Sequence, residues 1–531
     1  MSVSTQNEAP APARNQRLLQ VLVFVSGLSV MAVEMTGLRL LAPFFGTSLI
    51  VTTVLIGSMM GFLSLGYALG GRWGDQRPTL QALSKVTAAA SVSILLIPFL
   101  GQPILRGAAA VLRPLLEGKQ LDEPTVAVAM LVGGTLGTIG LFALPVTLMG
   151  TVSPWAVRLA VADVQNAGRA AGRLYALSTF GSILGSFLPA LVLVPALGVR
   201  NTFLFVGALL LAVSAVGLIG GLRAALAPTA ALSLMIVPPG VTRPMEGLIL
   251  EEESLYHFIQ VVREPYGKSC PDALHLYLNE GVGVHSVKCM VPGMDIRGVW
   301  TYMATMPFYF DDLAKFNDVL IIGLAGGTIA RQMLQAFPEI EVDGVEIDGA
   351  VVEVGKKYLD NDDPRIRPIV MDGRIFLQLT EKKYDLVMMD AYRQPYIPFH
   401  LVTTEFFEEV KAHLTEDGLV AVNVASVRGI SQRLGQMIYR TLKETFPTVV
   451  VIEATTSNTV ILASMRAKDL YLAADQLEAL SPAPVALAGV QKQLRKKIVA
   501  DIPGWEGARL LTDDQAPVEQ AWDLMALEYA K

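Results

Sequence analysis

Glycine and acidic residues recur at the ends of successive apolar segments in the C-terminal half of the chain. Gly323, Gly326 and Gly327 follow the segment "DVLII" and open a helix-like stretch. Such a turn lets a backbone approach a ligand closely and directs amide N–H groups toward it. Glu346 ends the next apolar segment, about 20 residues later, where a carboxylate can accept hydrogen bonds from ribose hydroxyls.

Two further acidic residues follow the third and fourth segments. Asp372, with Gly373 after it, is placed to meet the edge of an adenine, and Asp390 begins a loop. A carboxylate at Asp390 can orient a protonated amine and take its proton. A role for Asp390 in fixing the loop or capping a helix is the alternative. The four segment ends together predict a nucleoside-binding Rossmann domain.

The surrounding pattern predicts the elements that position these residues. "YHFIQVV" and "ALHLYL" are typical of strands, and a helix-like stretch lies near 298–310. From residue 318 onward, strand-like and helix-like segments alternate. This alternation predicts a parallel sheet with helices on both faces and with ligands at the carboxyl ends of its strands.

The two halves of the chain differ in composition. The 531 residues are 52% hydrophobic and 17% charged; 14 basic and 7 acidic residues lie before residue 243, and 28 basic and 41 acidic residues after it. An acidic second half is a poor partner for nucleic acid. Cys270 and Cys289 lack metal-ligand spacing, so we expect two unpaired thiols and no metal site.

Long apolar stretches in the first half predict a helical bundle that crosses a lipid bilayer. Each needs about 20 residues to cross. Six stretches qualify, and a weaker seventh covers 224–239; the six are 18–45, 48–70, 86–105, 125–149, 174–197 and 201–221. Glu34 lies inside the first, and an ionisable group at that depth is a candidate functional residue or a packing partner for Arg39.

Basic residues in the short loops predict the orientation of the bundle. With six spans, one side carries nine basic residues and the other carries five. The N-terminus and the second half are therefore expected in the cytoplasm, at a multi-pass inner membrane. A seventh span would reverse the second half, so 224–239 is interpreted as interfacial or re-entrant, ending at Pro238, Pro239 and Gly240.

Five segments resemble the successive motifs of the spermidine synthase family. They are "EEESLYHFIQV", "VLIIGLAGGT", "VEID", "DPRIRPIVMDGRIFL" and "YDLVMMDAYRQPYIP". The resemblance covers about 243–465, and the whole chain resembles the membrane-fused subgroup, in which a transporter-like bundle precedes the synthase-like domain. It implies a polar tail over 1–17, a membrane domain over 18–242, a small β-unit over 243–310 and a Rossmann-like domain over 311–531.

The resemblance also implies a donor and roles for individual residues. The donor would be decarboxylated S-adenosylmethionine or S-adenosylmethionine, without a metal. Glu346 would bind the ribose, Asp372 the adenine amino group, and Asp390 would belong to the catalytic loop. Tyr256, Tyr392 and Arg393 would line a pocket for a polyamine-like amine acceptor. Assembly as a homodimer is left open.

Several residues depart from the family pattern. Gly326 and Arg393 stand where the family has acidic residues, Val299, Trp300 and Thr301 replace a Tyr-His-Glu segment, and His257 replaces a glutamine. Loss of two carboxylates weakens a site for a dication. Methyl or aminocarboxypropyl transfer from S-adenosylmethionine is therefore an alternative to aminopropyl transfer. A transporter-like protein whose degenerate synthase domain senses a ligand is a further alternative.

Overall fold

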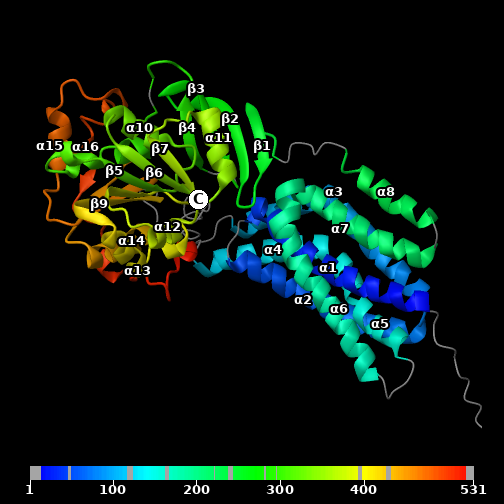
Figure 1. The fold of residues 1–531 in the computed structure, drawn as a ribbon. Coiled ribbons are helices and arrows are strands. Elements are labelled where there is room, and N and C mark those ends of the chain that lie inside the picture. Colours follow the sequence, from blue (N-terminus) through cyan, green and yellow to red (C-terminus); the bar gives the residue numbers. More distant parts are fainter. Residues whose placement is uncertain are drawn as a thin grey trace, which may run out of the picture. The chain divides into compact units, whose positions relative to one another are not determined.

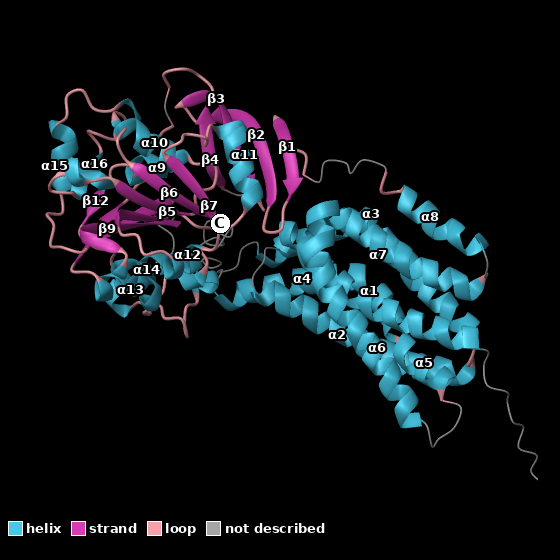
Figure 2. Cartoon of the chain, viewed as in Figure 1, coloured by secondary structure: helices cyan, strands magenta, loops and turns pink. Residues whose placement is uncertain are grey.

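The chain forms two compact units that divide between Thr242 and Arg243 in a computed structural model (Figure 1). The structure describes residues 13–45, 49–116, 123–161, 167–219, 222–236, 243–279, 283–294, 296–392, 397–425 and 432–521. The first unit is helical, and the second combines strands and helices (Figure 2).

The first unit is built from long apolar helices and short connecting turns. In chain order these are α1 (Ala13–Phe45), α2 (Leu49–Gln76), α3 (Leu80–Leu116), α4 (Glu123–Gly150), α5 (Val152–Ala160), α6 (Ala167–Leu188), the π-turn η2 (Pro189–Leu193), α7 (Val194–Leu218), the 3-10 turn η3 (Leu222–Ala225) and α8 (Leu226–Ser233).

Five helical segments in the described residues are long and apolar enough to cross a membrane: Asn15–Ala42, Val51–Gln76, Leu80–Ala108, Leu131–Ala160 and Ala167–Leu218. The last, of 52 residues, is broken at Gly198, where φ is +76°. The weak seventh stretch contains α8, whose eight residues extend only about 12 Å along the helix axis. A bilayer core is about 30 Å thick, so α8 is too short to cross it.

Small residues bring α1 and α6 into close contact. A Cβ atom on Gly181 would lie 2.1 Å from the carbonyl oxygen of Phe24, and one on Gly185 would lie 2.1 Å from that of Leu28. Backbones can approach this closely only where side chains are absent, as in helix pairs packed in lipid. Large apolar side chains such as Phe180 and Phe187 point outward from the same helix and are exposed, as expected for a surface that meets lipid.

The second unit begins with a four-stranded antiparallel sheet in the order β1-β2-β3-β4. Its strands are β1 (Leu248–Glu253), β2 (Phe258–Tyr266), β3 (Cys270–Leu278) and β4 (Val284–Cys289). Cys270 and Cys289 form a disulfide with a Cα separation of 5.9 Å. The expectation of two unpaired thiols is therefore wrong, because the antiparallel pairing of β3 with β4 brings distant cysteines together.

An eight-stranded sheet follows, in the order β12-β10-β11-β9-β8-β5-β6-β7. Its strands are β5 (Asp318–Ile322), β6 (Glu341–Glu346), β7 (Ile366–Val370), β8 (Tyr384–Met389), β9 (Leu414–Ala425), β10 (Thr448–Ile452), β11 (Asn458–Ser464) and β12 (Ile498–Val499). Strands β7, β6, β5, β8 and β9 are parallel, as predicted. The prediction of an all-parallel sheet is wrong beyond β9, because β11, β10 and β12 pair antiparallel.

Helices cover both faces of this sheet (Figure 2). They are α9 (Val299–Met303), α10 (Thr328–Ala336), α11 (Gly349–Leu359), α12 (Gly373–Leu379), α13 (Thr404–Ala412), α14 (Arg433–Thr445), α15 (Leu472–Ala479) and α16 (Leu494–Lys497), with 3-10 turns η4 (Met306–Tyr309), η5 (Leu313–Lys315), η6 (Phe399–Leu401), η7 (Val485–Leu487) and η8 (Trp505–Gly507). Strand alternation divides the core: Val319 and Ile321 pack with α10, whereas Leu320 and Ile322 pack with α12, α13 and α14.

Candidate functional site

The glycine-rich turn joins β5 to α10 at the carboxyl edge of the sheet. Gly323 and Gly327 have φ values of +92° and +78°, which favour glycine. A Cβ on Gly323 would lie 2.5 Å from the carbonyl oxygen of Asp390, and one on Gly327 would lie 2.2 Å from Oδ1 of Asn361. Glycine therefore lets the turn pass close to the start of the loop after β8 at Gly323, and close to Asn361, just after α11, at Gly327.

The amides of this turn already have partners inside the domain. The amides of Gly323 and Leu324 donate to the carbonyl of Val345, at 2.8 and 3.1 Å. The Gly326 amide donates to Oγ of Ser286 at 2.9 Å. The sequence predicted that this turn would direct free N–H groups at a ligand. The structure instead uses those groups to hold the turn, which leaves close backbone approach as its contribution.

Glu346 ends β6 with its side chain buried beneath the turn. Its Oε2 accepts the amide of Ala325 at 3.0 Å, and its Oε1 accepts the amide of Asp348 at 3.2 Å. Burial raises the pKa of Glu346, while the positive character of His257 and the two amides oppose that rise. Each carboxylate oxygen retains capacity for a second hydrogen bond, so Glu346 can still meet a ribose.

Sequence reasoning missed a buried triad beside Glu346. Nδ1 of His257 lies 2.9 Å from Oδ2 of Asp348, and the Ser254 hydroxyl donates to the same oxygen. Burial alone would raise the pKa of Asp348, but hydrogen bonds from His257 and Ser254 hold it below its usual value. The motif "VEID" contained Asp348, and the motif "EEESLYHFIQV", about 90 residues upstream, contained Ser254 and His257, but neither motif indicated that these residues would meet.

Asp372 caps the N-terminus of α12 and contacts a histidine. Its Oδ1 accepts the amides of Arg374 and Ile375 at 2.9 and 3.1 Å, and its Oδ2 lies 3.0 Å from Nε2 of His400. The hydrogen bond with His400 leads the effects that lower the pKa of Asp372. A Cβ on Gly373 would lie 2.3 Å from Cγ2 of Ile322, so glycine lets α12 begin against the end of β5.

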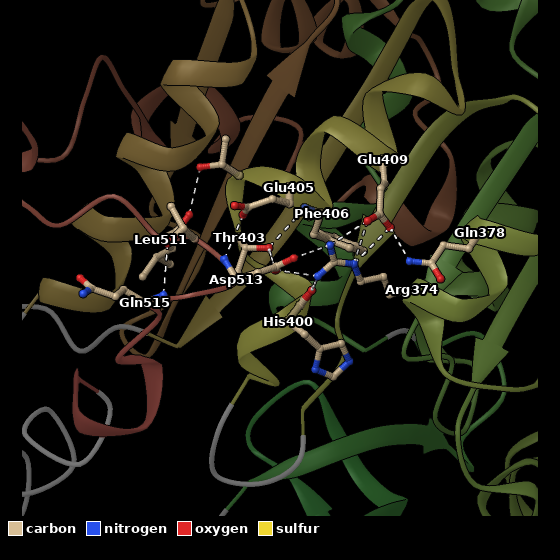
Figure 3. Close-up of polar contacts among 12 residues, drawn as sticks. Arg374, Gln378, His400, Thr403, Glu405, Phe406, Glu409, Leu511, Asp513 and Gln515 are labelled. Atoms are coloured by element: carbon tan, nitrogen blue, oxygen red, sulfur yellow. Dashed lines mark hydrogen bonds and ion pairs between the residues drawn. The ribbon is translucent and has the colours of Figure 1, made fainter.

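Arg374 ties this region to three other segments, as Figure 3 shows. Its guanidinium pairs with Glu409 of α13 at 2.7 Å and with Asp513 of the C-terminal segment at 2.7 Å. Its Nη1 also donates to the carbonyl of His400 at 3.1 Å. Arg374 therefore holds the far end of the loop that begins at Asp390 next to the cap of α12.

Asp390 follows β8 and is half-buried beside neutral polar side chains. Its amide donates to the carbonyl of Ile322 at 2.9 Å. Its Oδ1 accepts Nδ2 of Asn423 at 2.7 Å, and the Trp300 side chain also donates to the carboxylate. Burial raises the pKa of Asp390 to about 7, against the two hydrogen bonds, which lower it. A carboxylate poised near neutral pH is suited to exchange a proton with an amine.

Tyr392 lies beside Asp390 but its hydroxyl serves the neighbouring strand. That hydroxyl donates to the carbonyl of Asn423 at 2.9 Å and accepts the amide of Ala425 at 2.8 Å. Burial, followed by the charge of Asp390, raises its pKa. Tyr392 is thus placed to hold the end of β9 at the site.

Three other candidate residues are not brought into this group. Tyr256 is exposed in the turn between β1 and β2, and the contact described for it is its amide donating to Ser254. Arg393 lies outside the described residues. Glu34 is buried within α1 of the first unit.

Within the described ranges, histidine, cysteine, aspartate and glutamate form no group of three that could hold a metal ion. A cavity of about 830 Å³ lies elsewhere in the second unit, lined by Tyr266, Lys268, Arg297, Val485 and Gly489 among others. None of the predicted site residues borders it.

The mixed sheet and the helices on both of its faces define the second unit as a Rossmann-like domain. Residues 299–469 match the family model of the spermine/spermidine synthase domain. Through this unit the chain is similar to spermine and spermidine synthases.

Three proteins that resemble this chain each match about half of it or less. The polyamine aminopropyltransferase of Vibrio vulnificus is 29% identical over 277 residues, which cover 51% of this chain and 90% of that protein. A protein of Bifidobacterium longum named "Probable polyamine aminopropyl transferase" is 32% identical over 213 residues, covering 40% of this chain and 45% of that protein. The spermidine synthase of Thermotoga maritima superposes with a TM-score of 0.36 and 19% identity, over 47% of this chain and 88% of that one.

Proposed function

We propose that the protein is a membrane-anchored transferase that moves an aminopropyl group from decarboxylated S-adenosylmethionine to an amine acceptor. The similarity of the second unit to the spermine/spermidine synthase domain supports this class of reaction. Glu346 would hold the ribose of the donor, and Asp372 the adenine amino group. Gly323, Gly326 and Gly327 would let the backbone approach the donor closely.

The observation that carries the proposal is the environment of Asp390. It begins the loop after β8, next to the glycine-rich turn after β5, and its side chain is half-buried. Burial raises the pKa of Asp390 to about 7, so near neutral pH it exchanges a proton readily. An exposed loop carboxylate would remain a much weaker base.

The chemistry follows from this placement. An amine acceptor is mostly protonated near neutral pH, and Asp390 orients it and takes one proton. The freed nitrogen lone pair attacks the carbon beside the sulfonium, and a carbon–nitrogen bond forms as the carbon–sulfur bond breaks. The electron pair of the broken bond neutralises the sulfur, so methylthioadenosine leaves as a neutral thioether. Alignment of amine, carbon and sulfur supplies much of the remaining rate acceleration.

Replacing the carboxylate tests this role. We expect Asp390→Asn to lower the rate of methylthioadenosine release from decarboxylated S-adenosylmethionine and 1,4-diaminobutane by about 10²-fold or more. Donor affinity should change little, because Asp390 acts on the acceptor. Both are measured on the full chain in detergent, by chromatography of the nucleoside product and by calorimetry.

The exposed Asp362 offers a matched control, since Asp362→Asn removes one negative charge from the same domain. Its rate should equal that of the parent protein. Full transferase activity in Asp390→Asn would show that the assigned role is wrong. Donor binding without turnover in the parent protein would favour the ligand-sensing alternative.

A second reaction, methyl or aminocarboxypropyl transfer from S-adenosylmethionine, is favoured by Gly326. This residue supplies no carboxylate where the family has an aspartate, so repulsion of the donor's own carboxylate is absent. Methyl transfer would yield S-adenosylhomocysteine in place of methylthioadenosine. Aminocarboxypropyl transfer would yield methylthioadenosine but would require the intact donor. The donor and product together therefore separate the three reactions.

A further inference from the structure

We propose that Asn423 is a positioning residue for the transfer reaction, and that its side-chain amide, held in one orientation by Asn458, directs the Asp390 carboxylate and stabilises its charged form. This inference rests on the proposed function, because it concerns the same site. The three residues come from adjacent strands: Asp390 follows β8, Asn423 belongs to β9 and Asn458 begins β11.

Strand register places the two asparagines beside each other. Asn458 pairs with Ala425, two residues along β9 from Asn423, so the two side chains are diagonal neighbours on one face. Asn423 is buried. Its Nδ2 donates to Oδ1 of Asp390 at 2.7 Å, and its Oδ1 accepts Nδ2 of Asn458 at 3.1 Å.

The hydrogen bonds that Asn458 accepts determine the direction of the bonds between Asn458, Asn423 and Asp390. Oδ1 of Asn458 accepts the hydroxyls of Thr455 and Ser457, at 3.3 and 3.2 Å, which leaves its Nδ2 to donate toward Asn423. If the Asn423 amide were reversed, its NH₂ group would face the NH₂ group of Asn458, and its oxygen would face the carboxylate oxygen of Asp390. Each hydrogen bond therefore points toward the carboxylate, and a chain of bonds in one sense strengthens its members.

The backbone around Asn423 is held as well as its side chain. The Tyr392 hydroxyl accepts from Ala425 and donates to the carbonyl of Asn423. The Trp300 side chain also donates to Asp390, and its ring is buried. Within the described part of the site, Tyr392 is the titratable side chain whose charge couples to Asp390, and Asn423 and Trp300 are neutral.

The expected effect has a definite sign. Asp390 acts as a base only when deprotonated, so activity rises as pH passes upward through its pKa. Asn423 bonds to the charged form and lowers that pKa. Asn423→Leu removes the donor at similar volume, so the pKa rises and the acidic limb of the kcat profile moves to higher pH.

The test measures the protonation of Asp390 with and without turnover. In the full chain, the infrared band of the protonated carboxyl group is assigned by its absence in Asp390→Asn. We expect its midpoint, and the acidic limb of kcat, to rise by about one pH unit or more in Asn423→Leu. Asn458→Leu, which leaves Asn423 in place but free to turn, should give a smaller shift in the same direction. KM for the donor should stay unchanged in both.

Asn317→Leu provides the matched control, because Asn317 lies at the opposite edge of the same sheet, before β5. This variant should shift neither the midpoint of the Asp390 carboxyl titration nor the pH profile of kcat. Unchanged midpoints in Asn423→Leu and Asn458→Leu, with folded variants, would overturn the inference. A shifted midpoint in a protein that releases no methylthioadenosine would retain the inference about Asn423 and reject the proposed function.

Discussion

Gly326 shows how much depends on the surroundings of a single residue. The family resemblance aligns this position with an aspartate that recognises the donor's ammonium group. A Cβ at this position would lie 2.3 Å from Cδ1 of Leu359 and 2.8 Å from Cβ of Ser286. The space beside Gly326 is thus filled by α11 and β4, and a side chain here would enter packed protein.

Restoring the aspartate is therefore expected to fail. Gly326→Asp should lower the free energy of unfolding by about 1 to 3 kcal/mol, because overpacking displaces Leu359 or Ser286. Affinity for decarboxylated S-adenosylmethionine should not rise. Thermal unfolding and calorimetry measure the two effects. Gly507→Asp is the control, since nothing lies within 4 Å of a Cβ there. A stable Gly326→Asp protein with tighter donor binding would contradict this account.

Residue type and position after a strand predicted Glu346, Asp372 and Asp390, which all lie at the carboxyl edge of the sheet. The same reasoning could not find Asn423 or Asn458. An asparagine inside or beside a strand has no distinctive spacing, and its role depends on which strands become neighbours.

At the scale of elements, the alternation from β5 to β8 was predicted correctly because each parallel strand is separated from the next by a helix. Beyond β9 the prediction failed. The segments "VVVIEA" and Asn458–Ser464 are joined by a short connection, which permits only antiparallel pairing. That antiparallel pair brings Asn458 to the carboxyl edge, so the part of the fold that sequence reasoning missed also supplies a residue to the site.

The disulfide was missed for a similar reason. Cys270 begins β3 and Cys289 ends β4, so both lie at the same end of this antiparallel pair, but their spacing in sequence has no framework to suggest a bridge. Register between antiparallel strands, which depends on the turn between them, determines that they meet.

At the scale of the whole molecule, two features disagree about the side of the membrane on which the second unit lies. The basic residues of the loops favour the cytoplasmic side, and the disulfide favours the other side. With six spans, nine basic residues on one side against five on the other predict a cytoplasmic N-terminus, and α8 is too short to reverse the second unit. Disulfides, in contrast, are typical of oxidising compartments. We propose that the second unit lies on the cytoplasmic side, because the charges of the loops bear on the orientation of every span.

A C-terminal reporter tests this orientation. A fused green fluorescent protein should fluoresce, and a fused alkaline phosphatase, which requires disulfides of its own, should be inactive. The contrary pattern would place the second unit outside the cytoplasm, where the Cys270–Cys289 bond would persist.

Calorimetric titration of the full chain in detergent tests the central claim most directly, because every role assigned here requires an adenosyl donor at the carboxyl edge of the sheet. Decarboxylated S-adenosylmethionine should bind more tightly than S-adenosylmethionine. Glu346→Ala should weaken its binding about tenfold or more, since a hydrogen bond to a charged group is lost. Absence of binding by either donor and by methylthioadenosine would contradict the assignment of the second unit as a transferase.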